Sequence, residues 1–231
     1  MSVFLLPFEI TKDLERSISR FWWNSKTNDN MSIHWMSWDR LSRHKSAGGM
    51  GFRDFRDFNL AMHGKQAWRF ITNPNSLATR LYKARYFPNN SFMEANIGNN
   101  PSFVRRSIWE AKQVISAGMR WKIGSGNAVD IIGQPWLLDD NNPFITSDIR
   151  GLKNHKVSAL MVDNQREWDE EILRDMFNDR DQQCIRRIRP NVNENDDVMY
   201  WGEEATGQYT VRSTDFYKLR RVFGGKSTSI A

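Results

Sequence analysis

Large aromatic side chains occur in every part of this chain, which contains 10 Trp, 14 Phe and 5 Tyr among its 231 residues. Each aromatic ring buries a large apolar area, so the chain has material for a core although only 39% of its residues are hydrophobic. Disordered chains are poor in aromatic residues. The sequence therefore predicts a folded protein, and its length allows one large domain or two small ones.

Apolar residues recur at helical spacing in several segments. The first stripe, which predicts a helix over about residues 11–23, consists of Leu14, Ile18, Phe21 and Trp22. Gly, Pro, Ser, Asn and Asp mark the helix ends further along the chain. They predict helices at residues 55–71, 77–84, 102–118, 169–177 and 181–189, with Ser102, Asp169 and Asp181 as N-caps.

Short extended segments separated by glycine-rich turns predict two β-hairpins. One pairs residues 121–123 with 129–132, and the other pairs residues 198–201 with 208–211. The fold class is therefore α+β, mainly α-helical with two short β-hairpins. Residues 138–166 are irregular and hydrophilic, which is typical of a linker. A last short helix is predicted from Ser213, followed by a disordered tail over residues 223–231.

The net charge of +6 is unevenly distributed along the chain. Residues 1–126 contain 19 Lys/Arg and 9 Asp/Glu, a balance of +10, whereas residues 127–231 contain 14 and 18, a balance of −4. A basic region favours a polyanionic partner such as nucleic acid, bound through phosphate neutralisation and counterion release. An ordinary solvated surface explains the same charges equally well. The candidate phosphate-binding residues are Arg53, Arg56, Lys65, Arg69, Arg80, Lys83, Arg85, Arg105 and Arg106.

Aromatic residues lie between these cations in the sequence, and an exposed aromatic ring could stack on a base. The four closest to the basic residues are Trp68, Tyr82, Tyr86 and Phe87. Aromatic residues at helical spacing more often belong to a core, and this reading is favoured for Trp68, Phe55 and Phe58.

Two pairs of adjacent acids, Asp139-Asp140 and Asp196-Asp197, are the nearest approach to a polymerase metal site. Such a site needs carboxylates that hold two metal ions, usually an aromatic-x-Asp-Asp turn with a distant third aspartate. Both pairs stand beside asparagines in polar sequence, where adjacent acids are ordinary turn formers. We therefore predict no catalytic residues.

The remaining residues capable of chemistry are scattered. Cys184 is the only cysteine, which excludes an intramolecular disulfide and a multi-cysteine zinc site; we expect it to be a buried or half-buried residue of a helix. The segment Gly224-Gly225-Lys226-Ser227-Thr228 lacks the first glycine of a P-loop, and Gly48-Gly49-Met50-Gly51 is read as a structural turn. The histidines at positions 34, 44, 63 and 155 follow no metal-ligand spacing and are expected at the surface or the core edge.

These observations predict no metal site, no cofactor and no small-molecule substrate. No apolar run reaches the length of a membrane span, and the apolar start of the chain lacks the basic and small-residue signals of a secretory leader. We therefore expect an intracellular protein without membrane contact.

A longer pattern of aromatic and glycine motifs resembles a known family. It includes Phe21-Trp22-Trp23, Trp35-Met36-Ser37-Trp38, Gly49-Met50-Gly51-Phe52, Ala67-Trp68-Arg69, Arg85-Tyr86-Phe87-Pro88, Arg120-Trp121-Lys122-Ile123-Gly124 and Gln208-Tyr209-Thr210-Val211-Arg212-Ser213. This order is similar to the segment after the polymerase core in the reverse transcriptases of plant non-LTR (LINE-type) retrotransposons. The same segment occurs in short plant reading frames, including mitochondrial ones. The resemblance covers about residues 1–217.

The resemblance implies a fragment without the active sites of the parent polyprotein, since the polymerase core precedes the segment and the zinc-binding and RNase H domains follow it. It implies a thumb- or connection-like helical region at 1–137, a linker at 138–166 and a small α+β module at 167–222. The implied function is a non-catalytic fragment that retains weak nucleic-acid binding. The alternative is a segment that docks on a reverse transcriptase core and has no binding activity of its own.

Overall fold

The computed structural model describes residues 3–24, 34–43, 45–162, 167–190 and 196–214. The chain divides into two units. Unit 1 comprises Met1–Ser116 and Thr210–Phe216, and unit 2 comprises Ala117–Tyr209 and Tyr217–Ala231. The predicted division into a region at 1–137, a linker at 138–166 and a module at 167–222 stays a prediction. The expected disordered tail and most of the expected last helix lie outside the described residues.

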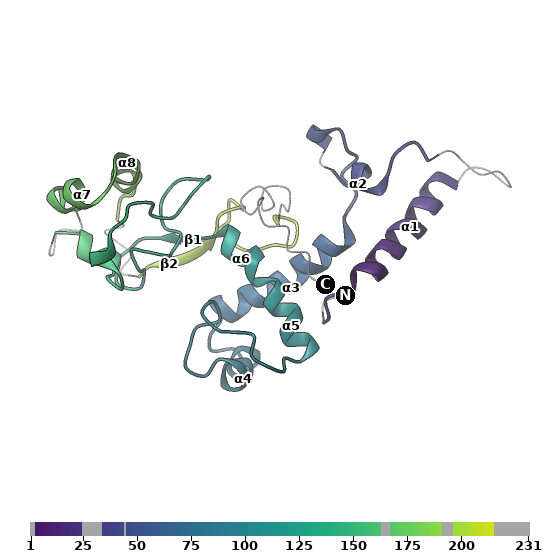
Figure 1. Cartoon of the computed structure of the whole chain (residues 1–231), viewed down its shortest axis with the longest axis horizontal. Helices are drawn as coiled ribbons and strands as arrows, with labels where there is room; N and C mark the ends of the chain where they lie inside the picture. The colour runs from purple at the N-terminus through teal and green to yellow at the C-terminus, as the bar shows by residue number, and fades with distance from the viewer. Residues whose placement is uncertain (1–2, 25–33, 44, 163–166, 191–195, 215–231) are drawn as a thin grey trace. The chain divides into compact units, whose positions relative to one another are not determined.

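Unit 1 is organised around its longest helix, α3 (Phe55–Thr72) (Figure 1). This helix packs against α1 (Phe8–Asn24), α4 (Leu77–Tyr86) and α5 (Phe103–Glu110), so it is held between three neighbours. The short helix α2 (Trp38–Leu41) lies against α1, a 3-10 turn follows at Lys45–Ala47, and α6 (Lys112–Gly118) continues from α5.

Side-chain caps explain where three of these helices begin. Asp54, Ser76 and Ser102 have extended backbones and accept hydrogen bonds from the N–H three residues further on, at 2.9, 3.2 and 3.3 Å. The predicted helices at 55–71 and 77–84 are confirmed, as is the Ser102 cap. The predicted single helix at 102–118 is two helices, because the chain turns at Ala111 between α5 and α6.

Helix α1 is confirmed, but it turns its apolar stripe outward. Its buried side consists of Thr11, Glu15 and Ser19, whereas Leu14, Ile18, Phe21 and Trp22 are exposed. The polar side is held inward because the Glu15 carboxylate accepts hydrogen bonds from Lys12 Nζ at 2.8 Å and from the N–H of Phe55 at 3.3 Å. Within the apolar stripe, Trp22 still packs edge-to-face on Phe52, with ring centroids 5.0 Å apart, and Phe21 is the most exposed side chain, at 75%.

Aromatic rings form much of the core of unit 1. Phe70 of α3 lies 4.7 Å from the ring of Tyr82 on α4 and 6.0 Å from that of Phe92, which in turn lies 5.9 Å from Phe87. Trp68, Phe70, Phe87 and Phe92 are all buried. The core reading of Trp68 is thereby confirmed.

Unit 2 contains a two-stranded antiparallel sheet, β1 (Met119–Lys122) and β2 (Val198–Trp201), with Met119 opposite Trp201 (Figure 1). It also contains two 3-10 turns, Arg150–Leu152 and Val157–Leu160, and two helices, α7 (Glu170–Met176) and α8 (Asp179–Arg187). The predicted class, mainly helical α+β, is confirmed.

The predicted strand pairing is wrong. Residues 119–122 pair with 198–201, so neither predicted hairpin forms among the described residues. Val129 and Ile131 instead exchange backbone hydrogen bonds with residues 155–157, where Ile131 N–H donates to His155 O and Val157 N–H donates to Val129 O. Both apolar side chains are thereby buried in the core of unit 2. Long-range burial has overridden the local turn signal.

The core of unit 2 collects residues from widely separated parts of the chain, including Trp136, Leu173, Phe177, Ile185 and, within the irregular segment 138–166, Ile149, Val157 and Leu160. Asp169 caps α7 as predicted, accepting from the N–H groups of Glu171 and Ile172. The predicted cap of α8 is wrong, because Asn178 caps that helix and Asp181 lies within its first turn. No helix among the described residues is long and apolar enough to cross a membrane.

Candidate nucleic-acid interface

The middle of unit 1 is nearly free of acidic residues. Residues 58–109 contain seven Lys/Arg and one Asp/Glu, which is Glu94. The cations lie on three packed helices: Lys65 and Arg69 on α3, three residues on α4, and Arg105 and Arg106 on α5. The sequence therefore concentrates positive charge on one group of neighbouring elements.

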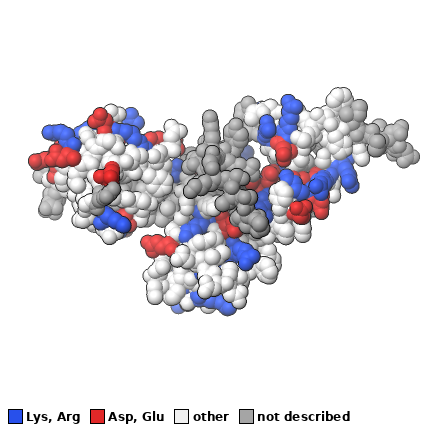
Figure 2. Space-filling view, in the orientation of Figure 1, with Lys and Arg blue, Asp and Glu red and all other residues white. Residues whose placement is uncertain are grey.

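Helix α4 carries the densest part of this charge, and it contains no acidic residue. Arg80, Lys83 and Arg85 are all exposed. In Figure 2 blue atoms lie along the lower edge of the molecule, where Figure 1 shows α4. The exposed cations of α3, α4 and α5 are called the basic set below: Lys65, Arg69, Arg80, Lys83, Arg85 and Arg106.

Arg85 lies 5.5 Å from the Tyr86 ring but stays exposed, and three further candidate cations also make contacts within unit 1. Arg56 donates a hydrogen bond of 2.6 Å to the carbonyl of Leu6. Arg105 donates one of 2.6 Å to the carbonyl of Asn96, and its guanidinium lies 4.6 Å from the Tyr86 ring. The guanidinium of Arg53 lies 4.6 Å from the Phe58 ring, although Arg53 is exposed. Arg56 and Arg105 hold loops in place, and the basic set excludes all three.

The aromatic residues that the sequence placed beside these cations are largely unavailable for stacking. Trp68 and Phe87 are buried, and Tyr82 and Tyr86 are half-buried. Burial, together with the neighbouring Tyr86, raises the pKa of Tyr82 to about 12. Sequence reasoning missed a different ring, Phe103 at the start of α5, whose exposed fraction is 77%.

One member of each carboxylate pair, Asp139 or Asp197, has structural partners in unit 2. Asp139 accepts hydrogen bonds from the N–H groups of Asn141 and Asn142 and lies 2.7 Å from Arg180 Nη2. The hydrogen bond from Arg180, followed by that from Asn141, lowers the pKa of Asp139. This geometry is the turn that the sequence predicted.

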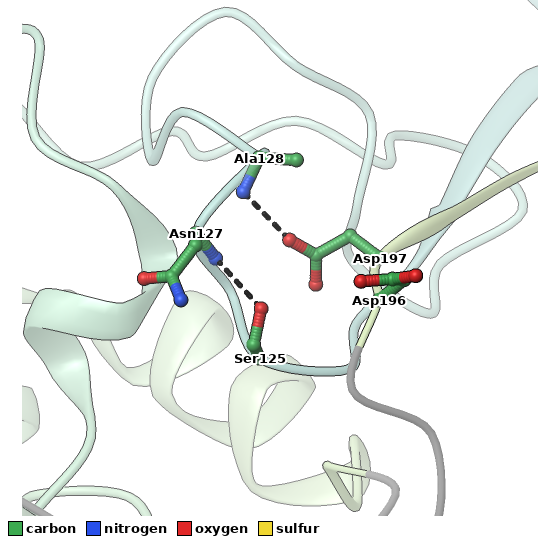
Figure 3. Close-up of a pocket in the computed structure, with 5 residues that line it drawn as sticks. All are labelled: Ser125, Asn127, Ala128, Asp196 and Asp197. Carbon is green, nitrogen blue, oxygen red and sulfur yellow. Dashed lines mark hydrogen bonds between the residues drawn. The ribbon is translucent and has the colours of Figure 1, made fainter.

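Asp197 is less exposed to solvent than the sequence suggested. Its Oδ1 accepts the N–H groups of Gly124 and Gly126, both at 2.8 Å, and its Oδ2 accepts that of Ala128 at 2.7 Å. Figure 3 shows this carboxylate pointing at the loop, beside a surface depression lined by both acids and the loop residues. The loop 124–128 is thus a cradle of backbone donors occupied by the protein's own carboxylate.

The other candidate groups are dispersed. Cys184 is buried on α8, as predicted. Among the described residues no three His, Cys, Asp or Glu side chains gather in a way that could hold a metal ion. Gly48 and Gly51 adopt φ angles of +75°, which fits the predicted structural turn. The Gly224–Thr228 segment and His44 lie outside the described residues.

His63 corrects the prediction that the histidines lie at the surface or the core edge. It is fully buried within α3, and its Nε2 lies 3.5 Å from Asn59 Nδ2. Burial lowers the pKa of His63 from its ordinary value of 6.5. The unfolded chain therefore takes up this proton at a higher pH than the folded chain does.

We expect the free energy of unfolding to fall as the pH drops below 6.5, because protonation of His63 then favours the unfolded state. His63→Gln should reduce this pH dependence. The measurement is urea denaturation at pH 7.5 and 5.5, with exposed His155→Gln as the control. An equal pH dependence in the His63 variant and the unchanged chain would contradict the assignment.

Two plant proteins are similar to this chain. The uncharacterized mitochondrial protein AtMg00310 of Arabidopsis thaliana is 38% identical over 141 residues, which are 61% of this chain and 91% of the relative. The chain belongs to the family of this mitochondrial protein. The family resemblance is confirmed in that respect, since short plant mitochondrial reading frames were part of it.

The second relative is the Arabidopsis thaliana protein named "Putative ribonuclease H protein At1g65750". It is 26% identical over 156 residues, which are 61% of this chain but only 24% of the relative. This chain is therefore also similar to a limited part of a much longer plant protein. No family model matches the chain, and no solved structure matches it.

Proposed function

We propose that the chain is a non-catalytic fragment of LINE-type reverse transcriptase origin that retains sequence-independent affinity for nucleic acid. The order of aromatic and glycine motifs over residues 1–217 supports this origin. So does the pair of relatives, one a short mitochondrial protein and the other a longer protein named for ribonuclease H. The proposed segment is the one between the polymerase core and the zinc-binding and RNase H domains.

The observation that carries the binding proposal is the basic set itself. Its six side chains are exposed on helices that pack together, and α4 contributes three of them without any acidic neighbour in its own sequence. Lysine and arginine that neutralise phosphates release condensed counterions, and this gain is independent of base sequence. A surface of this composition therefore binds the phosphates of the nucleic-acid backbone, whatever the base sequence.

A triple variant tests the binding surface. Changing Arg80, Lys83 and Arg85 to Gln should weaken binding to a labelled oligonucleotide at low salt by roughly 10-fold or more, because three phosphate contacts are lost. Fluorescence anisotropy gives the dissociation constants. The matched control changes three exposed cations of unit 2, Lys153, Arg174 and Arg189, to Gln. Equal weakening in both triple variants would show that net charge alone is responsible and would refute the assignment to α4.

Primer extension on an RNA template with Mg²⁺ or Mn²⁺ tests the non-catalytic part. We expect no template-dependent synthesis, because Asp139 is paired with Arg180 and Asp197 with the loop 124–128. Synthesis that disappears in Asp139→Asn or Asp140→Asn would overturn this part of the proposal.

A second candidate function, docking on a reverse transcriptase core, is favoured by helix α1. Its outward stripe leaves Ile10, Leu14, Ile18 and Phe21 with exposed fractions of 49, 36, 38 and 75%. Continuous apolar surface of this kind is typical of a protein interface. Helix α3, by contrast, has no exposed large apolar side chain.

Binding in trans tests the docking candidate. A polymerase core of the same retroelement class should be retained by the immobilised chain, and Leu14→Gln with Ile18→Gln should abolish retention without unfolding the chain. Retention that survives this double variant would exclude α1 as the docking surface.

A further inference from the structure

Phe103 is the most exposed large apolar residue among those the structure describes, with an exposed fraction of 77%. It is the first residue of α5, and two positions on, Arg105 turns inward to Asn96 and Tyr86. A phenylalanine ring in water costs free energy of solvation, since it has no polar group to compensate. Phe103 also lies in the part of unit 1 that is rich in Lys and Arg and nearly free of acidic residues.

The place of Phe103 is fixed by contacts between α4 and α5. The Oγ of Ser102 lies 3.1 Å from the hydroxyl of Tyr86, the last residue of α4, and it also accepts the N–H of Arg105. The Arg105 guanidinium lies 4.6 Å from the Tyr86 ring. The residues on both sides of Phe103, Ser102 and Arg105, therefore hold this part of the backbone against the C-terminal end of α4.

Two members of the basic set lie close to this position along the fold. Arg106 is three residues after Phe103 on α5, so the two side chains share one face of the helix. Arg85 directly precedes Tyr86, and its guanidinium lies 5.5 Å from the Tyr86 ring. The acidic residue on the same face of α5, Glu110, lies two turns beyond Phe103. The exposed ring thus shares its helix face with Arg106, and its helix begins beside the end of α4 that carries Arg85.

This arrangement matches what an unpaired nucleotide needs. Its base has a free π-face that stacks on an aromatic ring, and its phosphates need cations within one nucleotide of the stacked base. A base pair inside a duplex is already stacked and offers only its backbone and groove edges. We propose that Phe103 is a stacking platform for an unpaired base and that this surface prefers single-stranded nucleic acid to duplex. This rests on the proposed nucleic-acid binding and adds the class of ligand.

The test compares a single-stranded oligonucleotide with a duplex of equal length by fluorescence anisotropy at one salt concentration. Phe103→Ala should weaken single-strand binding roughly 5- to 150-fold, as expected for the loss of one stacked base, and leave duplex binding unchanged. Phe103→Trp should retain the affinity for the single strand. The control, Trp35→Ala, removes a ring that is also 75% exposed and lies outside both proposed surfaces, and it should change neither affinity.

The outcomes separate the two proposals. Binding that is unaffected by Phe103→Ala, or that weakens equally for single strand and duplex, overturns the stacking platform and leaves the phosphate-binding surface in place. Failure of the unchanged chain to bind either oligonucleotide at low salt overturns the proposed function, and the stacking platform with it.

Discussion

Replacing Asp181 by alanine should destabilise the protein by about 3–5 kcal/mol, the range for removing one partner of a buried charge network. The Asp181 side chain is fully buried. It accepts hydrogen bonds from the N–H groups of Thr146 and Ser147, both at 2.8 Å, from Ser147 Oγ at 2.6 Å and from Arg180 Nη1 at 2.8 Å. Alanine leaves these donors without their acceptor inside unit 2.

Chemical denaturation measures this loss, and two further variants identify its cause. Asp181→Asn keeps the shape and one oxygen, so its loss should be smaller than that of the alanine variant. Asp179→Ala removes an exposed carboxylate from the same helical turn and should cost less than about 1 kcal/mol. Equal losses for Asp179→Ala and Asp181→Ala would contradict the network.

The same carboxylate makes the stability of unit 2 depend on acid. Burial alone would raise the pKa of Asp181, but the hydrogen bonds from Ser147 and Thr146 outweigh burial and lower this pKa. A carboxyl group with a lower pKa in the folded state stabilises the fold above its unfolded pKa, so this contribution is lost as the pH falls below the ordinary value of 3.8.

The second large effect is expected at Asp197, where alanine should cost about 2–3 kcal/mol because the N–H groups of Gly124, Gly126 and Ala128 lose a charged acceptor. The loop 124–128 directly follows β1, and Asp197 directly precedes β2. Loss of the carboxylate should therefore also loosen the pairing of the two strands. Amide exchange at Arg120 and Tyr200, which face each other across the two strands, should become faster.

The neighbouring Asp196 is the matched control, because it is also an aspartate beside the loop 124–128 but is exposed. Among the described residues, it makes no hydrogen bond to the loop. Asp196→Ala should change the free energy of unfolding by less than about 0.5 kcal/mol. If both variants lose the same stability, the cradle in Figure 3 contributes nothing beyond local charge.

Helices could be predicted from the sequence because their signals are local. The caps Asp169 and Ser102 and the turn residues 73–75 that follow helix 55–71 all lie within a few residues of the helix ends they determine. The strand pairing could not be predicted in this way. Met119 pairs with Trp201 across some eighty residues, and this pairing depends on burial of Trp201 and on the Asp197 cradle rather than on a turn between the strands.

The candidate site shows the same division between local and long-range information. Charge is local, so the nine candidate cations could be selected from the sequence. Which of them face solvent depends on tertiary contacts: Arg105 turns toward Asn96, whereas Arg106 stays exposed. The orientation of α1 and the exposure of Phe103 likewise follow from packing between helices, which periodicity alone does not determine.

The salt dependence of binding tests the central claim most directly. A plot of log K against log salt concentration for a single-stranded oligonucleotide should be linear, with a slope of about −4 if the six residues of the basic set each neutralise a phosphate. The Arg80, Lys83 and Arg85 triple variant should bring the slope to about −2. A slope near zero, or one that the triple variant leaves unchanged, would contradict nucleic-acid binding through this surface.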